Sequence, residues 1–234
     1  MKSLSALTLT VLIALIAIST LAVKQTAASS LPNNPESKAD DTLYLRRYTD
    51  NNLTTAEPDS TTAANITIKG RNTVTQRWVN ETAVPNGYNW TINPGTYNFT
   101  FWISRSHQNI TVNVDFTFGY INADGQSTTI VTGQRTGLEP PVNNITMYNI
   151  TVYKGESVSI SSGSKLFINV TISVSGPGGQ SATFYYDGIS QPTQIITPSI
   201  SAVVPEFPFG AVFLPPALLS AYFILKKRIV KLKI

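Results

Sequence analysis

The sequence predicts an all-β domain, an antiparallel β-sandwich of two sheets stacked face to face. Three stretches carry this prediction, because apolar and polar residues alternate along residues 96–104, 109–120 and 166–174. A period of two over eight to twelve residues is typical of a strand with one face in the core and the other in water. About eight to ten such strands, each with one apolar face, need a second sheet to cover that face.

The N-terminal segment, residues 1–28, is predicted to be a helical signal peptide. Lys2 supplies the positive start, a run rich in apolar and hydroxyl residues follows, and the small residues 26–28 suit a cleavage site. The run is also long enough for an uncleaved membrane helix, which is the alternative. Residues 29–42 are polar and contain prolines, as is typical of a flexible spacer.

The sandwich itself is expected over residues 43–200. Its strands are separated by turn signals such as Pro94-Gly95, Asp124-Gly125 and the Gly-Pro-Gly-Gly run at 176–179. The apolar stripes of the long strands are expected to form the core, and burial of each large side chain there is worth roughly 1.5–3 kcal/mol. The shorter predicted strands lie at residues 43–45, 66–68, 74–79, 127–131, 147–152, 157–160 and 182–186.

The C-terminal segment is predicted to anchor the chain in a membrane. After a short stalk, residues 201–206, no charged side chain occurs in residues 207–225, and cations crowd residues 226–234. A helix over 207–225 would be about 28 Å long, close to the thickness of the bilayer's hydrocarbon core. Because a basic flank stays in the cytoplasm, the sandwich is expected outside the cell. The alternative is a buried core helix followed by a basic surface turn.

The tail resembles a known sorting signal. The tripeptide Pro205, Glu206 and Phe207, the apolar run and the basic cluster together resemble the C-terminal Pro-Glu-Phe signal of archaeal surface proteins. This resemblance covers only the last thirty or so residues. It implies an archaeosortase-like processing enzyme as a partner and a lipid that replaces the removed tail.

The sandwich resembles the jelly-roll ectodomains of many prokaryotic surface proteins. Residues 94–99 (Pro-Gly-Thr-Tyr-Asn-Phe), 163–166 (Gly-Ser-Lys-Leu) and 185–188 (Tyr-Tyr-Asp-Gly) carry this resemblance. It implies a jelly-roll-like order of strands and a relation in shape to carbohydrate-binding modules.

Composition excludes several classes of function. The chain has no cysteine, which excludes disulfides, thiolate chemistry and cysteine zinc sites. The net charge of +4 comes from the two ends, because residues 29–204 hold ten Lys and Arg against twelve Asp and Glu. With no basic patch in that middle part, nucleic acid is not an expected partner.

The strongest chemical signal is the Asn-x-Thr sequon, the acceptor motif for N-glycosylation. An acceptor must face solvent, and four of the asparagines lie on the polar phase of their strands: Asn65, Asn98, Asn109 and Asn169. Chance in a sheet rich in Asn and Thr is the alternative. Asn144 and Asn149 are five residues apart, so one of them is expected in a turn or beside a bulge. The nine sequons begin at Asn52, Asn65, Asn80, Asn89, Asn98, Asn109, Asn144, Asn149 and Asn169.

Catalytic and metal-binding signals are weak, and the prediction is that the chain is not an enzyme. The carboxylates are scattered without a tight pair, and the single histidine, His107, lies in a polar hairpin. Asp124 and Asp187 are the candidates for a structural calcium site, and no other cofactor is expected. Trp102 lies on the polar phase of its strand and is the candidate platform for stacking on sugar rings; the alternative is packing under a loop.

Together these features predict a glycosylated surface protein anchored in the cytoplasmic membrane, with a structural or adhesive role in the cell envelope and no catalysis. The expected partners are the membrane and envelope proteins or glycans. A surface-tethered carbohydrate-binding module that uses Trp102 is the second hypothesis. A surface hydrolase is the third, and carboxylates that converge in a cleft would favour it.

Overall fold

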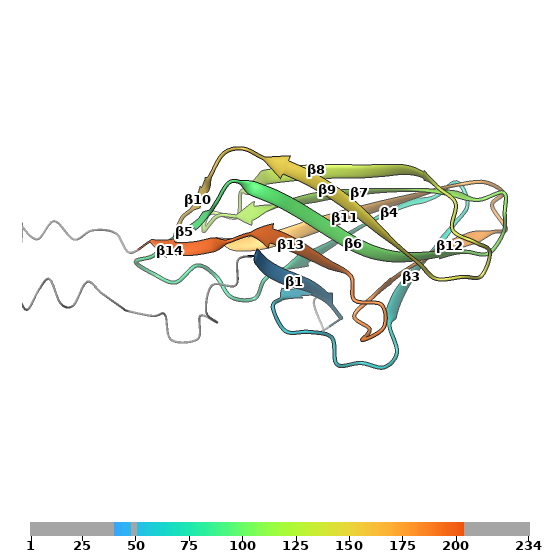
Figure 1. The fold of residues 1–234 in the computed structure, drawn as a ribbon, viewed down its shortest axis with the longest axis horizontal. Coiled ribbons are helices and arrows are strands. Elements are labelled where there is room, and N and C mark those ends of the chain that lie inside the picture. Colours follow the sequence, from blue (N-terminus) through green and yellow to red (C-terminus); the bar gives the residue numbers. More distant parts are fainter. Residues whose placement is uncertain (1–39, 48–50, 204–234) are drawn as a thin grey trace, which may run out of the picture. The chain divides into compact units, whose positions relative to one another are not determined.

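Strands form all the regular structure in the part of the chain that the structure describes. The computed structural model describes residues 40–47 and 51–203 (Figure 1). Within these residues no helix is long and apolar enough to cross a bilayer. The predicted signal peptide, most of the predicted spacer, the sorting motif and the predicted anchor lie outside the described residues.

Fourteen strands follow one another in the described residues. They are β1 (Asp40–Arg46), β2 (Asn52–Thr54), β3 (Ala64–Lys69), β4 (Thr73–Val79), β5 (Asn89–Ile92), β6 (Gly95–Arg105), β7 (Thr111–Ile121), β8 (Ser127–Leu138), β9 (Thr146–Lys154), β10 (Val158–Ile160), β11 (Lys165–Ser175), β12 (Ser181–Tyr186), β13 (Gln194–Pro198) and β14 (Ile200–Val203).

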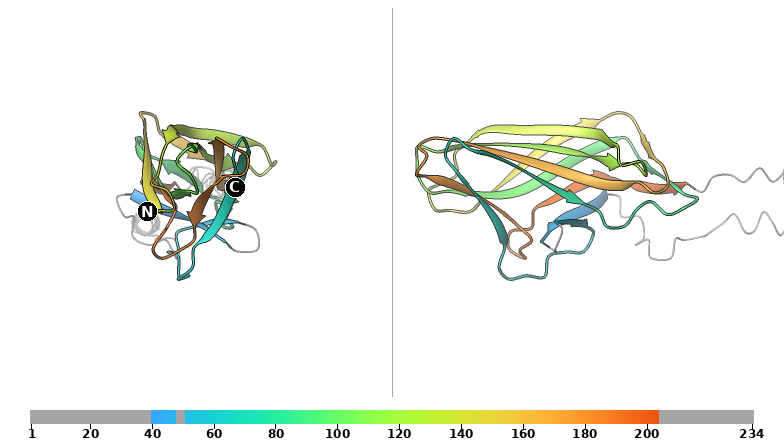
Figure 2. Two further views of the ribbon diagram at one scale, coloured as in Figure 1. Left: turned by 90° about the vertical axis from the view of Figure 1, so that its right-hand side faces the viewer. Right: turned by 180° about the vertical axis from the view of Figure 1, so that it is seen from behind.

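Eleven of these strands form one hydrogen-bonded sheet, in the order β3-β12-β6-β13-β1-β2-β4-β11-β7-β8, with β9 paired to β6 beside this path. Every pairing is antiparallel except the short contact between β2 and β4, where Asn52 pairs with Val79 in parallel. The remaining strands form a small sheet in the order β10-β5-β14. In Figure 1, β6 and β9 lie in front of β4, β7 and β11, which come to the front when the molecule is turned in Figure 2 (right).

The core lies between these two layers of strands. Phe99 of β6 and Phe116 of β7 face each other with ring centroids 5.2 Å apart, and Trp78 of β4 lies 6.5 Å from Phe184 of β12. All four side chains are essentially inaccessible to solvent. The predicted apolar stripes are therefore confirmed as core, and the all-β, sandwich-like fold is confirmed with them.

The connection between the layers differs from the prediction. Two separate stacked sheets were expected, whereas strands β13, β1 and β2 continue the hydrogen bonding from one layer to the other. The reason is that a period of two residues shows which face of a strand is buried but not which strands are neighbours.

Several strands escaped prediction because their sequences lack alternation. Strands β2, β5, β13 and β14 were not predicted, and β8 continues to Leu138, well beyond residue 131. The second half of β8 reads Thr-Gly-Gln-Arg-Thr-Gly and is held by pairing with β7. Strand β1 begins inside the predicted spacer, and β14 includes residues 201–203 of the predicted stalk, which pair with β5.

Tyr97, a buried residue of this core near the start of β6, makes the stability of the fold sensitive to high pH. Burial raises the pKa of the Tyr97 phenol to about 12. The unfolded chain loses this proton near pH 10, so the contribution to stability is complete below pH 10 and is lost as the pH rises toward 12. Each pKa unit corresponds to about 1.4 kcal/mol.

We therefore expect Tyr97→Phe to lose less stability between pH 9 and pH 11 than the wild type, by about 1 kcal/mol. Urea unfolding at both pH values measures this difference. The other buried tyrosines titrate in both proteins and cancel. An equal loss in the two proteins would contradict the expected role of Tyr97.

Candidate functional site

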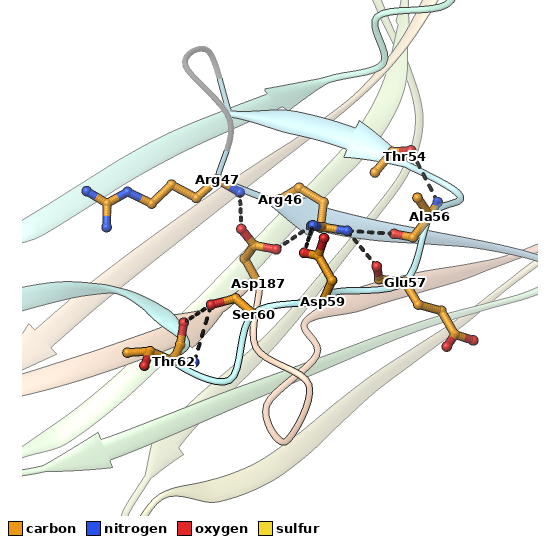
Figure 3. Close-up of polar contacts among 9 residues, drawn as sticks. All are labelled: Arg46, Arg47, Thr54, Ala56, Glu57, Asp59, Ser60, Thr62 and Asp187. Carbon is orange, nitrogen blue, oxygen red and sulfur yellow. Dashed lines mark hydrogen bonds and ion pairs between the residues drawn. The ribbon is translucent and has the colours of Figure 1, made fainter.

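The candidate functional site is a pocket of about 400 Å³ where β1 ends, here called the Arg46 pocket (Figure 3). Its walls come from the end of β1, the loop between β2 and β3, the start of β3, and the residue after β12. These residues belong to three stretches of the chain, 46–47, 59–64 and 187, so the pocket exists only in the folded chain. Its lining residues are Arg46, Arg47, Asp59, Ser60, Thr62, Ala63, Ala64 and Asp187.

Arg46 lies at the back of the pocket with its guanidinium group almost fully enclosed; its side chain is 4% exposed. Nη1 donates to the carbonyl oxygens of Ala56, at 3.3 Å, and Glu57, at 2.5 Å. Nη2 donates to Oδ1 of Asp59 at 2.5 Å, and Nε forms an ion pair with Oδ1 of Asp187. The planar fork of an arginine suits this role, because its donors can bind several acceptors at once.

Asp187 is the buried counter-charge of Arg46. Its second oxygen, Oδ2, accepts a hydrogen bond of 2.7 Å from the backbone N–H of Arg47. The residue has a φ of 57°, a left-handed conformation that Asp and Asn tolerate better than most residues. The next residue, Gly188, packs so closely that a Cβ there would lie 2.7 Å from Cβ of Ala63 in the pocket wall. Asp187 therefore locks the loop after β12 onto the end of β1.

The mouth of the pocket carries charges of both signs. The side chain of Asp59 is 82% exposed although one of its oxygens binds Arg46. Arg47 is exposed as well, and in Figure 3 its guanidinium points away from that of Arg46. Ser60 Oγ donates to the carbonyl oxygen of Thr62 at 2.8 Å. A ligand in this pocket would thus meet a carboxylate, a cation and hydroxyl groups.

The two candidate calcium ligands, Asp124 and Asp187, lie on different segments and make different contacts. Asp187 binds Nε of Arg46 through Oδ1 and the N–H of Arg47 through Oδ2, so both of its oxygens have partners within the chain. Asp124 is exposed in the turn between β7 and β8, where its N–H donates to Oδ1 of Asn122 at 3.1 Å. Among the described residues no group of three His, Asp or Glu could hold a metal ion.

Trp102 is not the exposed platform that the sequence suggested. Its ring is half-buried, and its Nε1 donates to the carbonyl oxygen of Pro192 at 3.2 Å. The loop between β12 and β13 therefore contacts the indole N–H, which leaves the ring less open than a fully exposed tryptophan. His107 holds a local turn, since its Nδ1 accepts a 3.2 Å hydrogen bond from the N–H of Asn109.

The nine sequon asparagines all lie in the described part of the chain, on strands and turns outside the lining of the Arg46 pocket. The sequence points to Asp187 for another role and to neither Arg46 nor Asp59. One signal could have pointed to Arg46. An arginine directly after the apolar cluster 43–45, in a chain with few charged residues, is a candidate for a buried ion pair.

The fold resembles parts of known hydrolases. An aminopeptidase from a marine sediment Thaumarchaeota archaeon shares it at a TM-score of 0.55 and 11% identity, over 70% of this chain and 37% of that one. An α-amino acid ester hydrolase shares it at a TM-score of 0.53 and 10% identity, over 68% of this chain and 36% of that one. A CocE/NonD family hydrolase from Staphylococcus aureus matches at a TM-score of 0.49 and 14% identity, over 74% and 38%.

No family model and no curated protein matches the sequence. The chain spans just over a third of the length of the hydrolases named above. At these identities the likeness shows the fold alone.

The likeness corrects the functional prediction. A structural or adhesive surface protein without catalysis was inferred from the sandwich, with a carbohydrate-binding module as the alternative, yet a sandwich of the same fold forms part of two hydrolases. The functional prediction relied on the sandwich fold, and this fold occurs in hydrolases as well as in structural proteins. The expectation that the chain is not an enzyme has no support from these likenesses either.

Proposed function

We propose that the chain is a sandwich module of a hydrolase assembly that acts on compounds with a free α-amino group, and that the Arg46 pocket holds that group. Two observations support the proposal. Two hydrolases that share the fold above a TM-score of 0.5 are named for such compounds, an aminopeptidase and an α-amino acid ester hydrolase. The pocket, in turn, presents a carboxylate at its mouth.

The proposal rests on the position of Asp59, which is bound to Arg46 and open to solvent at the same time. Arg46 holds one oxygen of its carboxylate, which fixes the side chain, while most of the group remains open to solvent. A fixed carboxylate accepts charge-assisted hydrogen bonds from an ammonium group, which are worth roughly 1.5–3 kcal/mol each. Arg47 can meet the carbonyl or carboxylate end of the same ligand, and Ala63 and Ala64 supply apolar wall. The volume of about 400 Å³ lies within the usual range for small-molecule sites.

We also propose that the chain is held at the cell surface. A jelly-roll-like strand order, a signal peptide and a membrane anchor with a Pro-Glu-Phe sorting motif agree with a module held at the cell surface. Intact-mass analysis of the protein extracted from membranes tests leader and tail removal together.

Binding of the ammonium group is tested with L-phenylalaninamide and its N-acetyl analogue, which lacks the charge. We expect the amide to raise the thermal midpoint of the purified full chain and the N-acetyl analogue to leave it unchanged. Binding at a hundredfold excess over Kd stabilises a protein by about 2.7 kcal/mol. Asp59→Asn should weaken binding about tenfold or more, since one lost charge-assisted hydrogen bond exceeds 1.4 kcal/mol. Equal effects of the two compounds would refute the proposed site.

The assembly is tested in the native host with an affinity tag inserted between Gly178 and Gly179, an exposed turn where added atoms meet nothing within 4 Å. We expect the isolated assembly to hydrolyse L-phenylalanine 4-nitroanilide. In Asp59→Asn, KM should rise about tenfold with kcat unchanged, because a lost binding contact common to substrate and transition state raises KM alone. An assembly without aminoacyl hydrolase activity would overturn the hydrolase part while leaving the binding test intact.

A further inference from the structure

The fold divides the sequon asparagines by accessibility. Four of them are exposed: Asn65 on β3, Asn109 and Asn144 in turns, and Asn149 on β9. Asn144 lies in the turn before β9, where its N–H donates to the carbonyl oxygen of Pro141 at 3.1 Å. This placement lets Asn144 and Asn149 both face solvent despite their five-residue spacing. These four asparagines are called the open sequons.

Three other sequon asparagines are less accessible, Asn52 buried and Asn98 and Asn169 half-buried, and they are called the closed sequons. Each lies on a strand that pairs on both sides. Asn52 of β2 lies between β1 and β4 and is only 8% exposed. Asn98 of β6 lies between β13 and β9, and its Oδ1 is enclosed without a hydrogen-bond partner.

Asn169 is the most firmly held of the closed sequons. It lies on β11 between β4 and β7, and its Oδ1 accepts a 2.8 Å hydrogen bond from Nε of Arg77. The hydroxyl of the same sequon is engaged too, because Thr171 Oγ1 lies 2.9 Å from Thr75 Oγ1. By contrast, Asn149 and Thr151 are both exposed on β9, which pairs only with β6 among the described strands.

We propose that the folded protein carries glycans on open sequons and on none of the closed ones. The reaction joins Nδ2 of asparagine to the anomeric carbon of a polyprenyl-phosphate-linked oligosaccharide. The bond from that carbon to the phosphate oxygen breaks, the polyprenyl phosphate leaves with the electron pair, and the amide proton passes to a base of the transferase.

Closed sequons stay unmodified for a steric reason, which holds whether the glycan is added before or after the chain folds. A glycan is bulky and fully hydrated, so it needs free solvent around Nδ2. On Asn52 it would have to enter the sheet beside β1 and β4. On Asn98 and Asn169 it would displace the packing or hydrogen bonds just described. A chain modified at a closed sequon would therefore fail to reach this fold, whereas an open sequon tolerates the addition.

The test is glycopeptide mass spectrometry on the folded protein purified from its native host. We expect glycan mass on peptides that contain Asn65, Asn109, Asn144 or Asn149, and unmodified asparagine at positions 52, 98 and 169. A glycan on any closed sequon, or bare asparagine at all four open ones, would overturn the proposal.

A matched pair of variants gives an independent readout. Asn149→Gln should lower the intact mass by one glycan, and Asn169→Gln should leave the glycan mass unchanged. Both substitutions remove one sequon from a strand of the large sheet, so only accessibility distinguishes them. The reverse pattern would contradict the division into open and closed sequons. Neither measurement depends on the proposed hydrolase function.

Discussion

Replacing Asp187 with asparagine should destabilise the fold by about 3–5 kcal/mol, the usual cost of removing one partner of a buried ion pair. The substitution leaves the enclosed guanidinium of Arg46 without its buried counter-charge. Asparagine has nearly the same shape and tolerates the left-handed backbone that Asp187 adopts. The loss therefore reports the charge and not backbone strain. Urea unfolding followed by tryptophan fluorescence measures it.

Asp59→Asn is the matched control, because Asp59 binds the same guanidinium from the solvent side. An exposed ion pair contributes little, since water screens it and both side chains lose freedom in forming it. We expect this variant to unfold within about 0.5 kcal/mol of the wild type. Equal losses in the two variants would show that burial does not decide the strength of these two contacts.

The contrast between these variants bears on the proposed site. If Asp187 supplies the stability, then Asp59 is free to serve a ligand without being needed for folding. A variant that folds normally and fails to bind separates function from structure. The buried pair Arg46–Asp187 thus stabilises the fold at the back of the Arg46 pocket. Asp59 and Arg47 form its mouth, where a ligand would bind.

The sequence predicts the core of this fold well because the core depends on local alternation. The apolar stripes on β6, β7 and β11 can be recognised without knowing which strands are adjacent, because alternate residues of a strand point to the same side. Strands β13 and β14 are different, because they are short and become strands through pairing with β1, β6 and β5. The order of strands is likewise a long-range property, so alternation does not predict that the large sheet continues from one layer to the other.

The candidate site was beyond sequence analysis for a similar reason. Arg46 and Asp187 are brought together by the pairing of β1 with β13 and the path of the loop between β12 and β13. Alternation would place Arg46 outside, because its neighbour Leu45 points into the core. The strand ends at this residue, and the guanidinium turns to the carbonyl groups of residues 56 and 57 instead. From the sequence, Asp187 is a candidate calcium ligand and part of the Tyr-Tyr-Asp-Gly motif, and nothing near it in the chain points to Arg46.

Trp102 shows how phase alone can mislead. It is on the outer face of β6, as its phase predicts, yet it is half-buried there and hydrogen-bonded to Pro192 in the loop between β12 and β13. An outward direction is thus a weaker statement than exposure. The same distinction separates Asn98, which is outward and enclosed, from Asn65, which is outward and open.

Gly119→Ala should be the second most damaging of the substitutions considered, with an expected loss of about 3 kcal/mol from overpacking. Gly119 lies on β7 where the register with β8 shifts. A Cβ at this position would collide with the backbone carbonyl oxygen of Thr128 and approach the Phe167 ring to 3.0 Å. Because the first obstacle is backbone, no change of rotamer relieves it, and β8 itself would have to move away.

Gly178→Ala provides the control for that experiment, because a Cβ there meets nothing within 4 Å and the residue is exposed. Its stability should stay within about 0.5 kcal/mol of the wild type. In thermal unfolding, about 3 kcal/mol corresponds to a midpoint roughly 6–12 °C lower for a domain of this size. If the two alanine variants had the same thermal midpoint, the backbone at the register shift beside Gly119 would have to accommodate a Cβ without loss of stability. The close pairing of β7 with β8 would then not depend on a missing side chain.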